Sequence, residues 1–114
     1  MAGVYTFLPL GYKVLKNIEK IIRENMERSP ANGQEVLMPV LQPKENWQKT
    51  GRWETLDILF KIKGNGDKEY AMGPTHEEVV SPLAKKNIFS YKDLPISLFQ
   101  IQTKFRDELR AKSG

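Results

Sequence analysis

The pattern that most restricts the fold of this chain is a pair of strand-like segments separated by a short turn. The segments are Leu56–Lys63 and Lys68–Met72, and the turn between them reads Gly64-Asn-Gly-Asp67. Glycine and asparagine accept the backbone angles of tight turns, so these residues favour a β-hairpin. A link this short joins antiparallel neighbours, because parallel strands need a crossover of a dozen or more residues. We therefore expect an antiparallel sheet in the middle of the chain.

An amphipathic helix precedes this sheet. From Tyr12 to about Arg28, apolar residues recur at helical spacing with charged residues between them. The run Ser29-Pro-Ala-Asn-Gly33 ends the helix, and Glu35–Leu41 reads as a mostly buried strand with a proline near its end. This order of elements is typical of an α+β fold.

Three further elements complete this α+β arrangement, whose sheet we expect to be largely antiparallel. They are a short helix over 43–50, a helix from Thr75 to about Lys86 that contains Pro82, and a last strand over Leu98–Glu108. The basic loop Arg110–Gly114 that follows is of the kind that precedes a return strand, and the absence of that strand suggests a fragment.

Composition limits the kind of protein and its partners. The chain has 114 residues, 39% of them hydrophobic, which suits one small domain or a piece of a larger one. A net charge of +4 favours anionic partners such as nucleotides or RNA. The chain has no cysteine, which excludes disulfides and thiolate metal sites. No apolar run is long enough for a bilayer and the start is unlike a signal peptide, so we expect a cytoplasmic protein without a membrane segment.

The last predicted strand carries an unusual polar face. With a period of two, five hydrogen-bonding residues share one side, and the other side is mostly apolar. The five are Gln100, Gln102, Lys104, Arg106 and Glu108. Such a face is either a solvated surface or the floor of a binding site. A guanidinium can grip a phosphate or carboxylate through paired hydrogen bonds, which makes Arg106 the strongest candidate. Glu108 could accept from an amino group of the same ligand, or simply pair with Arg106.

The segment Gly73-Pro-Thr-His-Glu-Glu78 also has two interpretations. Thr75 and Glu78 have the spacing of a helix capping box. Glu77 is not needed for that cap, and together with Thr75 it could hold an ammonium or imino group. His76 is the only histidine, so a metal site is not expected and we interpret it as an incidental loop residue. The tryptophans Trp47 and Trp53 are expected to pack in the core.

Taken together, these motifs resemble the class II aminoacyl-tRNA synthetases, and within them the bacterial-type prolyl-tRNA synthetases. The similarity covers nearly the whole chain, and its last two segments are the most specific. It is carried by Gly3-Val-Tyr5 with Leu8-Pro-Leu-Gly11, the helix followed by Gln34-Glu-Val-Leu-Met-Pro39, Trp47-Gln-Lys-Thr-Gly-Arg-Trp53, Gly73-Pro-Thr-His-Glu-Glu78 and Gln100-Ile-Gln-Thr-Lys-Phe-Arg-Asp-Glu108.

The resemblance implies a function and a role for each matching residue. The enzyme would be a proline–tRNA ligase that uses ATP to form prolyl-adenylate and transfers proline to tRNA(Pro). Thr75 and Glu77 would bind the imino group of proline. Arg106 would bridge the ATP α-phosphate and the proline carboxylate as the catalytic residue, and Glu108 would bind the adenine amino group. Mg²⁺ would assist, although its ligands are not identifiable in this chain.

The resemblance also implies an extent and an assembly. Residues 1–114 would run from class II motif 1 through the first strand of motif 2, in a partial catalytic fold that we expect to be inactive alone. The parent enzyme would be a homodimer through the motif 1 region. Two alternatives stay open: another class II synthetase, or a truncated non-catalytic paralogue acting as a dimerisation or RNA-binding module.

Overall fold

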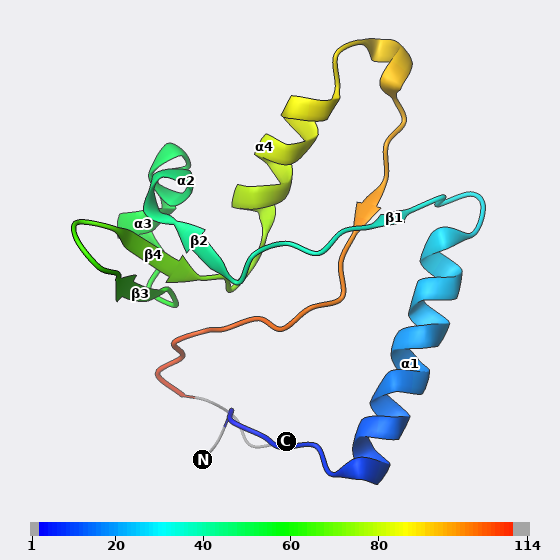
Figure 1. The fold of residues 1–114 in the computed structure, drawn as a ribbon, viewed down its shortest axis with the longest axis horizontal. Coiled ribbons are helices and arrows are strands. Elements are labelled where there is room, and N and C mark those ends of the chain that lie inside the picture. Colours follow the sequence, from blue (N-terminus) through cyan, green and yellow to red (C-terminus); the bar gives the residue numbers. More distant parts are fainter. Residues whose placement is uncertain (1–2, 111–114) are drawn as a thin grey trace. The chain divides into compact units, whose positions relative to one another are not determined.

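The computed structural model describes residues 3–110 of the chain (Figure 1). Its helices and strands are, in order, α1 (Pro9–Glu27), β1 (Gln34–Glu35), β2 (Leu41–Pro43), α2 (Lys44–Lys49), α3 (Arg52–Thr55), β3 (Phe60–Lys63), β4 (Glu69–Met72), α4 (Glu77–Asn87), the 3₁₀ turn η1 (Tyr91–Asp93) and β5 (Leu98–Phe99). These elements form two compact units. Of the described residues, one unit contains 3–36, Ile96–Ile101 and 109–110, and the other contains Leu37–Pro95 and Gln102–Glu108.

In the first unit, α1 confirms the predicted amphipathic helix and begins earlier than expected, at Pro9. Proline is tolerated in the first turn of a helix because its missing N–H would have no partner there. None of the residues of α1 is buried. Its apolar residues Val14, Ile18, Ile21 and Ile22 are each about half exposed. The helix therefore presents an apolar stripe that stays about half exposed among residues 3–110.

A two-stranded parallel sheet completes the first unit. Gln34 of β1 lies opposite Leu98 of β5, and Glu35 lies opposite Phe99. The side chain of Arg23, on α1, donates to Glu35 at 2.6 Å. This ion pair connects the helix to the strand that follows it.

The second unit is built on an antiparallel sheet of three strands in the order β2-β4-β3 (Figure 1). The predicted hairpin is confirmed, with Lys63 of β3 opposite Glu69 of β4. Within its turn, Gly66 has φ = +70°, an angle that favours glycine. On the other edge of β4, Gln42 of β2 lies opposite Ala71.

The core of this unit lies between the sheet and the short helices α2 and α3. It contains Trp47, Trp53, Leu59 and Ala71, all buried. The expectation that both tryptophans pack in the core is thus confirmed. Helix α2 agrees with the predicted helix over 43–50, whereas α3 has no counterpart among the predicted elements.

The sequence predicts one continuous strand over Glu35–Leu41, and this prediction is wrong. The segment between β1 and β2 has no strand structure, and the two short strands belong to different sheets. The reason is visible at Met38, whose backbone N–H and C=O both bond to the side chain of Gln102, at 3.1 and 2.8 Å. A side chain here satisfies the groups that a neighbouring strand would otherwise pair.

The predicted strand over Leu98–Glu108 is likewise wrong for most of its length, because only β5 is a strand. Beyond it, single backbone bonds replace a ladder: Phe105 donates to the carbonyl of Gly73 at 3.1 Å and Asp107 to that of Ile58 at 3.0 Å. The expected return loop over Arg110–Gly114 lies, apart from its first residue, outside the described residues.

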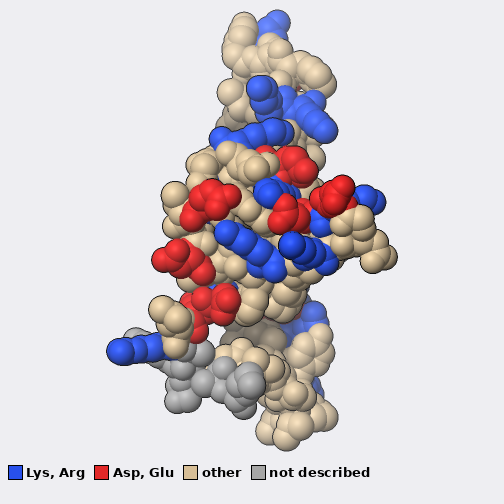
Figure 2. All heavy atoms as spheres, turned by 90° about the vertical axis from the view of Figure 1, so that its left-hand side faces the viewer, with Lys and Arg blue, Asp and Glu red and all other residues tan. Residues whose placement is uncertain are grey.

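Charged side chains of both signs are mixed on the face shown in Figure 2, where basic and acidic atoms lie side by side across the middle. Among the ion pairs of the second unit, Lys44 at the start of α2 pairs with Glu69 on β4. This pairing lowers the pKa of Glu69 through the hydrogen bond from Lys44. None of the described helices is both long enough and apolar enough to cross a membrane.

Candidate functional site

The segment that follows β4 is held tightly against the sheet. Gly73 donates its N–H to the carbonyl of Val40 at 2.9 Å. A Cβ at Gly73 would overlap the side-chain nitrogen of Gln42 and lie 3.1 Å from a ring carbon of His76. Only glycine allows this close approach, so the path of the segment into α4 depends on its lack of a side chain.

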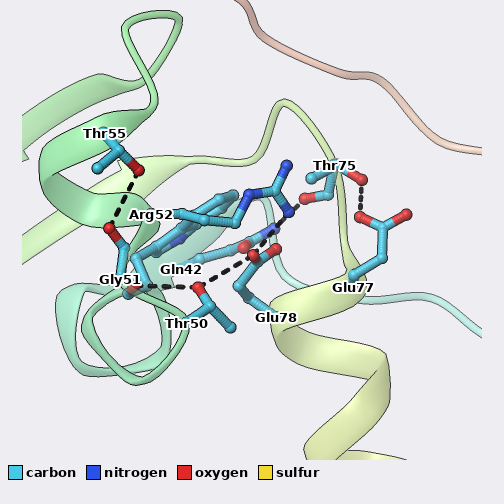
Figure 3. Close-up of polar contacts among 9 residues, drawn as sticks. Gln42, Thr50, Gly51, Arg52, Thr55, Thr75, Glu77 and Glu78 are labelled. Atoms are coloured by element: carbon cyan, nitrogen blue, oxygen red, sulfur yellow. Dashed lines mark hydrogen bonds and ion pairs between the residues drawn. The ribbon is translucent and has the colours of Figure 1, made fainter.

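Thr75 and Glu77 are brought together at the start of α4, as the sequence predicts for a joint binding site. The Thr75 hydroxyl donates to the Glu77 carboxylate, and Figure 3 shows the two side chains turned toward each other. The carbonyl of Thr75 is held by the buried side chain of Gln42, which donates to it at 2.9 Å. Glu77 is exposed, so a carboxylate and a hydroxyl are both available at this corner.

The predicted capping box between Thr75 and Glu78 is wrong. Helix α4 begins at Glu77, its N-cap residue is His76, and no side chain caps it. Glu78 is buried instead, with 1% of its side chain exposed, and it pairs with Arg52 at 2.8 Å. Thr50 adds a hydrogen bond to the same carboxylate oxygen at 3.3 Å (Figure 3). A buried carboxylate needs such partners because its charge is poorly solvated there.

A cavity of about 540 Å³ opens between α2 and α4, beside the Arg52–Glu78 pair. Its lining combines cations with carboxylates and includes Lys49, Arg52, Glu77, Glu78 and Lys85. The second carboxylate oxygen of Glu78 is buried and has no hydrogen-bond partner in the described part of the chain. The cavity therefore borders both the exposed and the buried carboxylate of α4.

The interpretation of His76 as an incidental loop residue is wrong. Only 1% of it is exposed. Its ring nitrogens lie 3.0 Å from the side-chain nitrogen of Gln102 and 2.6 Å from that of Lys104. Burial lowers the pKa of His76, and the charge of Lys104 lowers it further, whereas a backbone hydrogen bond with Pro39 and the charge of Glu77 oppose both.

Arg106 and Glu108 are both exposed, in the same unit as Thr75 and Glu77. The sequence left open a simple ion pair between them, but no ion pair between them forms among residues 3–110. Lys104 connects the two parts of the site electrostatically. Burial lowers its pKa, Glu77 opposes this, and Arg106 lowers it again. Charges at both ends of the proposed site thus act on Lys104.

The described residues contain no group of three His, Cys, Asp or Glu side chains that could hold a metal ion. No set of protein ligands for Mg²⁺ can therefore be named among these residues. Its participation stays a prediction from the resemblance, and no chemical step can be derived for it from this chain.

Comparison with known proteins identifies relatives of this chain. The sequence profile of the tRNA synthetase class II core domain (G, H, P, S and T) matches residues 60–114. The proline–tRNA ligase of Acidithiobacillus ferrooxidans is 52% identical over 99% of the chain. The chain is homologous to the prolyl-tRNA synthetases over nearly its whole length. It spans 20% of the length of that ligase, so the relationship concerns one fifth of a prolyl-tRNA synthetase.

Solved structures support the fold of this prolyl-tRNA synthetase relative. The Giardia lamblia prolyl-tRNA synthetase in complex with prolyl-adenylate has a TM-score of 0.83 at 25% identity, covering 95% of the chain and 23% of that enzyme. The RNA binding domain of threonyl-tRNA synthetase from Cryptosporidium parvum has a TM-score of 0.85 at 22% identity, covering 95% of the chain and 26% of that one. At such identity the second likeness shows only the fold. The predicted α+β class II architecture is confirmed.

Four residues hold this site together, and the sequence did not predict this role for any of them. They are Gln42, Arg52, His76 and Gln102. Gln102 was placed on the polar face of the last segment, but nothing local indicates that its partner is Met38, 64 positions away. The segment around Trp47–Trp53 offered a signal for Arg52 through the family resemblance, without a role. Their contacts become visible only in three dimensions.

Proposed function

We propose that this chain supplies part of the active site of a cytoplasmic proline–tRNA ligase. Residues 1–114 would extend from class II motif 1 through the first strand of motif 2. The observation that carries the proposal is the pairing of Thr75 with Glu77 in the same unit as Arg106, in a chain 52% identical to a proline–tRNA ligase. The substrates are then proline, ATP and tRNA(Pro).

The chemistry requires positioning and charge neutralisation rather than a protein nucleophile. The proline carboxylate attacks the α-phosphorus of ATP, a new P–O bond forms, and pyrophosphate leaves with the electrons of the broken bond. Thr75 and Glu77 bind the imino group, because a carboxylate is a natural partner for a cationic nitrogen. Arg106 bridges the α-phosphate and the attacking carboxylate, and Glu108 accepts from the adenine amino group. Prolyl-adenylate then passes proline to the 3′ end of the tRNA.

The same proposal includes a homodimer through the region of α1. The apolar stripe of that helix supports it, because Ile18 and Ile21 are 49% and 59% exposed on a helix that also carries many charged residues. A second copy of the stripe is a partner of matching chemistry, and most soluble oligomers are symmetric assemblies of identical chains.

Substitutions in the complete synthetase test the assigned roles through proline-dependent ATP–pyrophosphate exchange. Arg106→Ala should abolish measurable adenylate formation, because the charge that develops at the α-phosphate loses its cation. Glu77→Ala should raise KM for proline by about tenfold or more while KM for ATP changes little, which corresponds to the loss of one charge-assisted contact.

Exposed residues without ion pairs in the described part of the chain provide matched controls: Glu45→Ala for the carboxylate and Lys68→Ala for the cation. Both should leave exchange unchanged. An unaltered proline KM in Glu77→Ala would remove the imino-binding role. A wild-type enzyme that shows no proline-dependent exchange would remove the proposed function as a whole.

A further inference from the structure

Gln102 is oriented by two hydrogen bonds to one backbone residue. The N–H of Met38 donates to Oε1 of Gln102 at 3.1 Å, and Nε2 of Gln102 donates to the carbonyl of Met38 at 2.8 Å. The reversed amide would place donor against donor and acceptor against acceptor. The Met38 backbone therefore determines which end of the Gln102 amide carries the nitrogen.

This orientation favours one tautomer of His76. The amide nitrogen of Gln102 lies 3.0 Å from Nε2 of the imidazole, and an amide nitrogen can only donate. When Nε2 of His76 accepts this bond, the neutral ring carries its proton on Nδ1. An imidazolium would direct an N–H at the amide and lose the contact.

Lys104 faces the other ring nitrogen, with Nζ 2.6 Å from Nδ1. Burial and Arg106 lower the pKa of Lys104, although Glu77 opposes them. A positive charge on His76 would stand beside the charge of Lys104, with only Glu77 and the Pro39 backbone to favour it.

We propose that His76 is a positioning residue for proline capture. Its neutral imidazole joins the corner of Thr75 and Glu77 to the segment that carries Arg106, through Gln102 and Lys104. The inference rests on the proposed function, since proline is the ligand that this corner would receive. Protonation of His76 breaks the hydrogen bond to Gln102. As the pH falls, Thr75 and Glu77 therefore lose their fixed position relative to the segment that carries Arg106.

Nitrogen-15 NMR of the 114-residue chain tests the tautomer directly, because His76 is the only histidine and its ring signals need no assignment. We expect the Nδ1–H form at neutral pH and a midpoint of titration below the ordinary 6.5. Gln102→Glu replaces the donor by an acceptor, so it should move the proton to Nε2 and raise the pKa of His76. An Nε2–H tautomer in the wild-type chain, or a ring that does not respond to Gln102→Glu, would overturn the proposal.

Kinetics of the complete synthetase test the consequence. The wild-type KM for proline should rise as the pH falls through the pKa of His76, which lies below the ordinary value of 6.5. His76→Gln keeps an acceptor near the position of Nε2 but has no titrating ring. Its KM for proline should stay near the wild-type value and should no longer rise at low pH, a rise that we call the acid limb. His76→Leu should raise KM for proline about tenfold with little change in KM for ATP.

The arms of the experiment separate the possible failures. An unchanged proline KM in His76→Leu, or an acid limb that persists in His76→Gln, would refute the positioning role. If His76→Leu does not fold, as judged by circular dichroism, the glutamine variant and the NMR arm still decide. Absence of proline-dependent exchange in the wild-type enzyme would count against the proposed function, whereas the NMR result would still decide the state of His76.

Discussion

At the scale of single residues, the two consecutive glutamates at the start of α4 have opposite environments. Glu77 is exposed beside Thr75, whereas Glu78 is buried against Arg52 (Figure 3). Successive residues of a helix point about 100° apart, so one can face a ligand while the next faces the protein. Identical chemistry thus yields a proposed binding group at one position and a structural group at the other.

Loss of the Arg52 charge should destabilise the chain. In Arg52→Met the buried carboxylate of Glu78 keeps only Thr50 as a donor, so the free energy of unfolding should fall by about 1–3 kcal/mol. This is below the cost for a fully buried pair because 40% of the Arg52 side chain is exposed. Urea denaturation measures the change.

A nearby cation provides the control for that variant. Lys49 lines the same cavity and is exposed, so Lys49→Met should change the free energy of unfolding by less than about 0.5 kcal/mol. Equal stabilities of Arg52→Met and Lys49→Met would show that the Arg52–Glu78 pair contributes nothing. Glu78→Gln should lessen the effect of Arg52→Met, because the uncharged amide no longer needs a cation.

At the scale of elements, the connection between β4 and α4 sets the site. Gly73 bonds to Val40 on one side and to Phe105 on the other, so three segments distant in sequence meet at one backbone residue. The corner of Thr75 and Glu77 begins two residues later. Its position therefore depends on how closely these segments pack around the glycine.

Gly73→Ala should disturb this packing. The added Cβ would collide with Gln42 and press on His76, so the free energy of unfolding should fall by about 1–3 kcal/mol and the NMR signals of His76 should shift. Gly66→Ala is the control: its Cβ meets nothing within 4 Å, and only the positive φ opposes it, at about 1 kcal/mol. Unshifted His76 signals in Gly73→Ala would contradict the close approach.

At the scale of the whole molecule, α1 stands out because its apolar stripe is uncovered among the described residues. Burial of an isoleucine side chain is worth about 1.5–3 kcal/mol, and a symmetric dimer buries each such residue twice. A helix with four half-exposed aliphatic residues, Val14, Ile18, Ile21 and Ile22, is costly to leave in water. The proposed homodimer would remove that cost.

The assembly prediction concerns the complete synthetase. Ile18→Lys combined with Ile22→Lys should convert a dimer into a monomer, as measured by light scattering coupled to gel filtration. Lys13 and Lys20 already lie on the charged part of the helix, so Lys13→Glu with Lys20→Glu should leave the dimer intact. A monomeric wild-type enzyme would contradict the proposal, and so would a dimer that survives both isoleucine substitutions.

Local patterns determined much of this structure in advance. The helix α1, the β3–β4 hairpin and the short helix α2 follow from periodicity and turn residues within a few positions. The same patterns placed Trp47 and Trp53 in the core and brought Thr75 and Glu77 together as candidates. Backbone preferences and amphipathic spacing are properties of neighbouring residues, so the sequence alone expresses them.

Tertiary structure alone decided the rest. The buried His76 contacts Gln102, which lies 26 positions further along the chain. The side chain of Gln102 also replaces strand pairing at Met38, which lies 64 positions away in the sequence. The capping box failed because Arg52 offers Glu78 a charge partner that a local rule cannot anticipate. The predictions of long strands over Glu35–Leu41 and Leu98–Glu108 were wrong because a strand needs a continuous neighbouring strand to pair with. Here side-chain contacts and single backbone hydrogen bonds replace that pairing. Such partners are determined by packing, because the free energy of a buried polar group depends on what lies beside it in space.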